Sequence, residues 1–98
     1  MTTYAVILER FNEWDWTRTM REQDDWEAHA AFMDEVTTEG FVRLGGPLAS
    51  GRHVLLIVEA ADEAAVRRRL AEDPWWGSRL RFERLEAWDV LLRGPTSP

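Results

Sequence analysis

Two ionisable side chains, those of His29 and Asp73, have positions in this 98-residue chain that could support acid/base chemistry. His29 falls inside the apolar stripe of a predicted amphipathic helix. At the helical advance of about 100° per residue, that stripe follows Trp26, Ala30 and Met33. A histidine on a buried stripe is either a core residue with satisfied hydrogen bonds or a working group at the mouth of a pocket. In the second case it could move a proton near neutral pH.

Asp73 follows the second predicted helix and directly precedes Pro74. A negative charge at the C-terminal end of a helix is disfavoured by up to about 1 kcal/mol, so another group should compensate for it. In one account, Asp73 is the N-cap of the next turn, with Pro74 at its first position. In the other account, Asp73 reaches a cation, and His29 is a plausible partner if both helices lie on one face of a sheet. An aspartate so placed fixes the tautomer of an imidazole and raises its basicity.

The composition excludes several other kinds of site. The chain has no cysteine, which rules out disulfides, thiolate catalysis and cysteine-based zinc or iron–sulfur centres. Asp25 and His29, one helical turn apart, are the only helical pair that could begin a zinc site. A zinc site needs three or four ligands. We therefore expect no metal and no other cofactor.

Charge and the N-terminal segment bear on partners and location. The formal net charge of −6 disfavours a nucleic-acid partner, because phosphate binding needs a clustered basic face. Residues 1–11 lack a basic region followed by a long apolar segment. Neither a signal peptide nor a membrane span is expected from them, so a cytoplasmic location and no membrane partner are predicted.

Tryptophan is unusually frequent, with six residues in a small chain. This is more rigid apolar surface than a core of this size ordinarily uses, so part of it is predicted to line a cavity for a small-molecule ligand or to meet a partner. Trp14 and Trp16 lie in a polar connection over residues 12–23 that is longer than a plain turn requires. They either fold back onto the rim of the core or cover a ligand as a lid.

Apolar periodicity predicts the order strand, helix, strand, strand, helix, strand. Gly40 is placed to end the first helix and Asp62 to cap the second. Gly45-Gly46-Pro47 is predicted to be a tight turn, or a gap in the sheet edge that admits a ligand. The expected bounds are 4–11, 41–44 and 53–59 for the first three strands, 24–40 and 62–72 for the helices, and 80–92 for a long final strand or a bent pair of strands.

This order is typical of an α+β, ferredoxin-like βαββαβ protomer, in which two helices pack on one face of an antiparallel sheet. Two helices cover only one face, yet the first and third strands are apolar at both parities. A second copy of the chain is the economical cover for the other face. We therefore expect a single domain over residues 1–93, a loose tail over 94–98, and a homodimer whose sheets pack face to face as a dimeric α+β barrel.

Four short segments occur in a specific order and spacing: Arg21-Glu22-Gln23, the helix bearing His29, Gly46-Pro47, and Asp73-Pro74 followed by Trp75. With these segments the chain resembles the YciI-like (YCII-related) family from Tyr4 to about Leu92. The resemblance implies a fold similar to that of muconolactone isomerase, a ferredoxin-like protomer that dimerises through its sheet. It also implies that His29 and Asp73 form the family's active-site dyad.

The resemblance implies less about the reaction. Most members of the family have no established reaction, and a chlorohydroxyquinol dehydrochlorinase is one of the few with an assigned chemistry. Short members of the family lack the connection with Trp14 and Trp16. The substrate is therefore not carried over by the resemblance.

The leading hypothesis is a cofactor-independent lyase or isomerase that acts on a small cyclic or aromatic molecule by proton abstraction or elimination. His29 would move the proton, and Asp73 would orient the imidazole. The pocket would be shaped by Gly46, Pro47, Trp75 and Trp26. The alternative is a dimeric binding or accessory module that holds a metabolite without transforming it. In a third interpretation His29 is a core residue.

Overall fold

The computed structural model describes residues 1–95 of the chain as four β-strands, two α-helices and one short 3-10 helix. Residues 96–98, the last part of the predicted tail, lie outside the described residues. In chain order the elements are β1 (Thr2–Arg10), η1 (Met20–Glu22), α1 (Trp26–Thr38), β2 (Val42–Pro47), β3 (His53–Ala60), α2 (Glu63–Leu70) and β4 (Leu80–Ala87).

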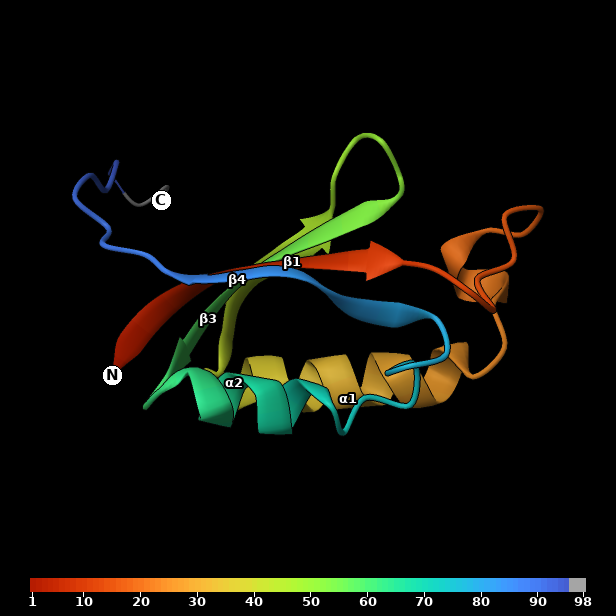
Figure 1. Cartoon of the computed structure of the whole chain (residues 1–98), viewed down its shortest axis with the longest axis horizontal. Helices are drawn as coiled ribbons and strands as arrows, with labels where there is room; N and C mark the ends of the chain where they lie inside the picture. The colour runs from red at the N-terminus through yellow and green to blue at the C-terminus, as the bar shows by residue number, and fades with distance from the viewer. Residues whose placement is uncertain (96–98) are drawn as a thin grey trace.

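The strands form one antiparallel sheet in the order β2-β3-β1-β4. α1 and α2 lie on one face of this sheet, and ion pairs of Arg69 on α2 with Glu35 and Glu39 join the two helices (Figure 1). The predicted α+β class is confirmed, and the order of elements and strands is compatible with a ferredoxin-like fold. Within residues 1–95, neither helix is both long enough and apolar enough to cross a membrane.

β1 forms the centre of the core through strand alternation. Tyr4, Val6 and Leu8 are buried on the helix side, whereas Ala5 and Ile7 lie on the opposite face and are half-buried. In the single chain, the strand that we predicted to be covered on both faces is therefore fully covered on one.

β2 contains the Gly45-Gly46-Pro47 segment, so the prediction of a tight turn at these residues is wrong. The segment pairs with β3, and the turn lies over residues 48–52 instead. Glycine is needed at position 45 because a Cβ there would lie 2.6 Å from Cδ2 of Leu56 on β3. Pro47 is tolerated because it is the last residue of an edge strand.

Replacing Gly45 by alanine is expected to lower the free energy of unfolding by about 1–3 kcal/mol, because the buried Leu56 side chain would have to leave its packing position. The matched control is Gly46→Ala, since an added Cβ at Gly46 meets no atom within 4 Å. That change should stay within about 0.5 kcal/mol. Urea denaturation followed by circular dichroism measures both variants, and equal stabilities would contradict this account of Gly45.

α1 ends at Thr38, and Gly40 just beyond it adopts the left-handed conformation predicted for the residue that stops the helix, with φ of +84°. The most buried side chains of this helix all belong to the predicted apolar stripe, on the side that Phe32 and Val36 widen: they are His29, Phe32 and Val36. The predicted centre of the stripe, with Trp26, Ala30 and Met33, is half-buried and borders a cavity. The helix therefore packs through one side of its apolar face and leaves the other side open to a ligand.

α2 is capped by Asp62 as predicted, since the Asp62 carboxylate accepts the backbone N–H of Ala65 at 2.8 Å. Val66 and Leu70 are buried beneath the helix, also as predicted. The helix ends at Leu70, slightly earlier than expected, and this earlier end leaves the following residues free to make the turn that carries Asp73.

β4 ends at Ala87, before the predicted end of the final strand at residue 92. Ala87 pairs with Tyr4, and among residues 88–95 only the backbone N–H of Trp88 still bonds to β1, at the carbonyl oxygen of Thr3. Residues 88–95 then leave the sheet (Figure 1). The C-terminal part of the predicted strand is therefore wrong for the single chain, although Thr2 and Thr3 of β1 lie beyond the last pair with β4.

The connection between β1 and α1 is tied to the body of the protein. Trp14 is buried, and its ring lies 5.3 Å from that of Trp75 in an edge-to-face arrangement. Gln23, also buried, donates to the carbonyl oxygen of Asp15 and accepts its N–H. Trp16 is 55% exposed. Trp14 therefore packs onto the core, as in the first of the two interpretations, whereas Trp16 lies on the surface.

Candidate active site

His29 and Asp73 form a buried pair. Nδ1 of His29 lies 2.9 Å from both carboxylate oxygens of Asp73, and less than a tenth of either residue is exposed. An ionised carboxylate can only accept hydrogen bonds. The imidazole proton is therefore on Nδ1, which donates the hydrogen bond to Asp73. In the neutral imidazole, the lone pair is then on Nε2.

The local chain path explains why Asp73 can face a helix other than its own. After α2, the N–H of Asp73 bonds to the carbonyl oxygen of Leu70, and the chain turns so that the Asp73 carboxylate accepts the N–H of Trp75 at 2.9 Å. The turn-capping account and the His29 account therefore both hold. Two donors, one from the backbone and one from the imidazole, compensate for a negative charge at a helix C-terminus.

Aromatic rings fix the plane of the imidazole. The ring of His29 stacks on that of Trp75, with centroids 3.8 Å apart and an interplanar angle of 11°. Trp26 lies tilted against both rings, at 5.8 Å from each. Trp75 is itself held by its indole N–H, which donates to the carbonyl oxygen of Asp24 at 2.7 Å. Since the ring is stacked on one side and hydrogen-bonded at Nδ1, Nε2 is the atom left to meet a ligand.

A cavity of about 620 Å³ lies beside this pair, between α1 and the β2–β3 edge of the sheet. His29 lines it, whereas Asp73 stands behind the imidazole and does not. The pocket residues expected from the sequence border the same cavity: they are Gly46, Pro47, Trp75 and Trp26. The remaining lining is largely apolar, with Leu8, Met20, Ala30, Met33, Val42, Leu44, Val54, Leu56 and Leu80. Residues from all four strands, from α1 and η1, and from the loop that carries Trp75 thus converge on one site.

Arg10, which sequence reasoning missed, also lines this cavity. It has the buried parity of Tyr4, Val6 and Leu8 on β1, and only 8% of it is exposed. The strand alternation could have revealed this residue, because Arg10 continues the series of β1 residues that face inward and yet is charged. Burial lowers the pKa of the Arg10 guanidinium from its ordinary value.

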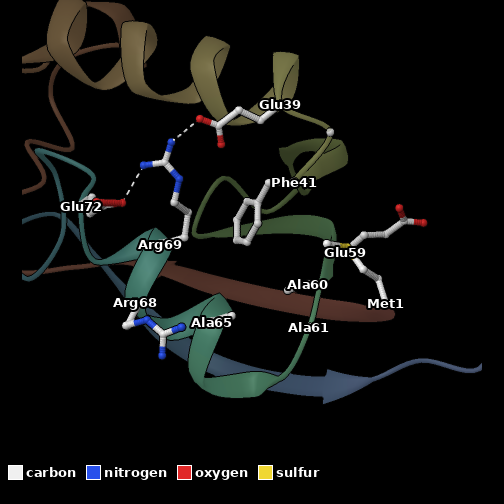
Figure 2. A pocket seen from close by; sticks show the side chains of 11 residues that line it. Met1, Glu39, Phe41, Glu59, Ala60, Ala61, Ala65, Arg68, Arg69 and Glu72 are labelled. Atoms are coloured by element: carbon white, nitrogen blue, oxygen red, sulfur yellow. Dashed lines mark hydrogen bonds and ion pairs between the residues drawn. The ribbon is translucent and has the colours of Figure 1, made fainter.

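A second cavity, of about 650 Å³, lies at the end of the sheet where β1 begins (Figure 2). Its charged side chains are largely committed to one another, since Arg69 bonds to Glu72 at 2.6 Å and to Glu39 at 2.7 Å. These bonds raise the pKa of Arg69. The lining contains no histidine and is centred on Phe41. It therefore offers no imidazole to a ligand, in contrast to the His29 cavity.

Metal ligands and relatives give no further guide to the chemistry. Within residues 1–95, no three His, Asp or Glu side chains are grouped so that they could hold a metal ion. The Asp25 carboxylate, considered above as a ligand beside His29, lies instead 3.9 Å from the guanidinium of Arg79. Comparison of the chain with models of protein families, with curated proteins and with solved structures finds no match in any of the three.

Proposed function

We propose that this protein is a cofactor-independent acid/base enzyme that removes a proton from a small cyclic or aromatic molecule. The supporting observation is the bond from His29 Nδ1 to Asp73 beside an apolar cavity. Because Asp73 holds the proton on Nδ1, neutral His29 presents a lone pair at Nε2 as a general base. Once Nε2 has taken a proton, the Asp73 carboxylate stabilises the imidazolium.

Two outcomes are open to the substrate carbanion or enolate that this step forms. In an isomerisation, Nε2 returns the proton to a different carbon of the same molecule. In an elimination, the electron pair released from the C–H bond expels a leaving group such as chloride from the neighbouring carbon. Neither the isomerisation nor the elimination needs an electron acceptor. A single group that first takes the proton as a base and later returns it as an acid is sufficient for both.

The cavity supports a flat, largely apolar substrate. Its volume of about 620 Å³ is within the range of small-molecule sites. The rings of Trp26 and Trp75 supply aromatic surface next to His29. On β2 the cavity is bordered by Gly46 and Pro47.

The same proposal includes a YciI-like homodimer built through the open face of the sheet. Ala5 and Ile7 lie on that face, Leu44 at its edge is 71% exposed, and the tail beyond β4 exposes Leu91 and Leu92 at 81% and 91%. Apolar surface of this kind is typical of an interface between copies. Sedimentation equilibrium should report a dimer, and a stable monomer at micromolar concentration would contradict it.

Deuterium exchange tests the proton transfer even when the product is unidentified. Small cyclic ketones, lactones and chlorinated hydroxy-aromatic compounds are incubated with the protein in D₂O, and loss of C–H signals is followed by ¹H NMR. For any compound that exchanges, His29→Gln is expected to slow the exchange by about 10²–10⁴-fold, because the general base is lost.

The matched control is His53→Gln, because the only other histidine lies away from the cavity and pairs with Glu83 at 2.6 Å. That variant should exchange as fast as the wild type. Exchange that is equally fast in His29→Gln would refute the assignment of the base. A ligand that binds tightly and is recovered with all its C–H protons would favour the non-catalytic binding module instead.

A further inference from the structure

We propose that Arg10 is an anion subsite of the His29 cavity and binds a carboxylate of the ligand, so that the ligand is a cyclic or aromatic monocarboxylate. The identification of the cavity as the substrate site rests on the function proposed above. The anion subsite adds the substrate class, and its evidence is independent of the dyad.

The Arg10 guanidinium is buried, yet its donors are only partly used. Nη1 donates to the carbonyl oxygen of Gly51 at 2.7 Å, and Nη2 reaches the Met20 sulfur, a weak acceptor, at 3.4 Å. Nε is buried and has no partner. The guanidinium carbon lies 4.3 Å from the centroid of the Trp14 ring, which holds the plane of the group. A planar fork with unused donors suits a carboxylate, which can accept two parallel N–H bonds.

The charge of Arg10 is also unbalanced. Among residues 1–95, only Arg10 and Arg79 are arginines with less than a tenth of their surface exposed. Arg79 faces the carboxylates of Asp24 at 3.7 Å and Asp25 at 3.9 Å. Within the same described part of the chain, no carboxylate lies within ion-pair distance of Arg10. A buried charge without a counter-charge is costly, and a ligand anion would remove that cost.

The wider charge distribution favours an anion at this place. The whole chain has a formal net charge of −6, yet the cavity is lined by three arginines and one aspartate, namely Arg10, Arg21, Arg43 and Asp34. Arg21 and Arg43 are exposed at the rim, so Arg10 is the one cation inside. A single interior cation among apolar side chains fits one carboxylate on an apolar ring better than a multiply charged phosphate.

A purely structural role is the competing account, in which Arg10 only ties the 48–52 turn and Met20 to the end of β1. The two accounts differ in what the guanidinium does when an anion is supplied. Benzoate and its neutral isostere benzamide are therefore suitable probes, since they differ in charge and hardly in shape. Both are titrated into the full-length ¹⁵N-labelled protein, and the backbone amide signals and the Arg10 Nε–H signal are followed by NMR.

Benzoate is expected to bind about 10- to 100-fold more tightly than benzamide and to shift the Arg10 Nε–H signal. Arg10→Gln should abolish this preference, and Arg10→Lys, which keeps the charge but loses the fork, should retain part of it. Arg21→Gln, which removes a rim charge, should leave most of the preference intact. Urea denaturation checks that each variant is folded, and the Arg10→Lys and Nε–H results keep the test valid if Arg10→Gln does not fold.

Three results would overturn the subsite: no saturable benzoate binding at millimolar concentration, equal affinities for the two probes, or an equal loss of preference in Arg10→Gln and Arg21→Gln. The function proposed above fails separately. If His29→Gln keeps the preference for benzoate and also exchanges substrate C–H protons as fast as the wild type, the anion subsite stands and the acid/base role of His29 falls.

Discussion

The Trp75→Ala variant is expected to lose about 3–5 kcal/mol of its free energy of unfolding. Trp75 is 1% exposed and is among the largest fully buried side chains of residues 1–95. It packs against Trp14 and Trp26 and stacks on His29, so its removal leaves a void among rings that have little room to close over it. The indole bond to the carbonyl oxygen of Asp24 is lost as well.

Urea denaturation monitored by circular dichroism measures this change, because fluorescence would combine signals from all six tryptophans. Trp16→Ala is the matched control. Trp16 is 55% exposed, so the same substitution there should cost no more than about 0.5 kcal/mol. A Trp75→Ala variant as stable as Trp16→Ala would mean that the ring cluster does not hold the site together.

The second large effect is expected for Asp73→Asn, which should slow any His29-dependent exchange by about 10²–10⁴-fold while the fold is retained. The asparagine oxygen can still accept the N–H of Trp75, so the turn is preserved. The asparagine NH₂ can then face Nδ1 of His29 as a donor. That arrangement favours the tautomer with the proton on Nε2, in which the atom facing the cavity has no lone pair to offer.

The tautomer of His29 is measured directly by ¹⁵N NMR of the imidazole nitrogens. In the wild type, neutral His29 should carry its proton on Nδ1, and in Asp73→Asn on Nε2. Glu72→Gln is the control, since Glu72 is the adjacent carboxylate but bonds to Arg69 on the surface. If the wild-type proton is found on Nε2, Asp73 does not orient the imidazole through Nδ1.

The features that the sequence predicted correctly depend on local pattern. Gly40 ends α1, Asp62 caps α2, and strand periodicity gives β1 and β3 within a few residues. These inferences needed only residue types, spacing and topology. For His29 and Asp73, the placement of two helices on one face left their contact as one of two accounts, and the family resemblance favoured it.

The features that were missed depend on contacts between distant segments. Gly45 is required by the Leu56 side chain on the neighbouring strand, which no local rule reveals, so the segment was interpreted as a turn. The early end of β4 at Ala87 depends on where its pairing with β1 stops, which the apolar periodicity of residues 80–92 does not reveal. Arg10 was overlooked although its inward parity on β1 was a local signal, and the 48–52 turn and Trp14 complete its burial.

Three of the bonds that build the site join segments far apart in the chain. His29 and Asp73 are 44 residues apart, Trp75 and Asp24 are 51 apart, and Arg10 and Gly51 are 41 apart. Each such contact requires closure of a long loop, whose entropy is repaid only when the sheet and both helices are in place. Folding intermediates that contain only part of the sheet would thus lack both the oriented imidazole of His29 and the buried guanidinium of Arg10. Chemical competence should consequently arise in a single late kinetic step, and nascent or proteolysed chains should be inert toward the substrate.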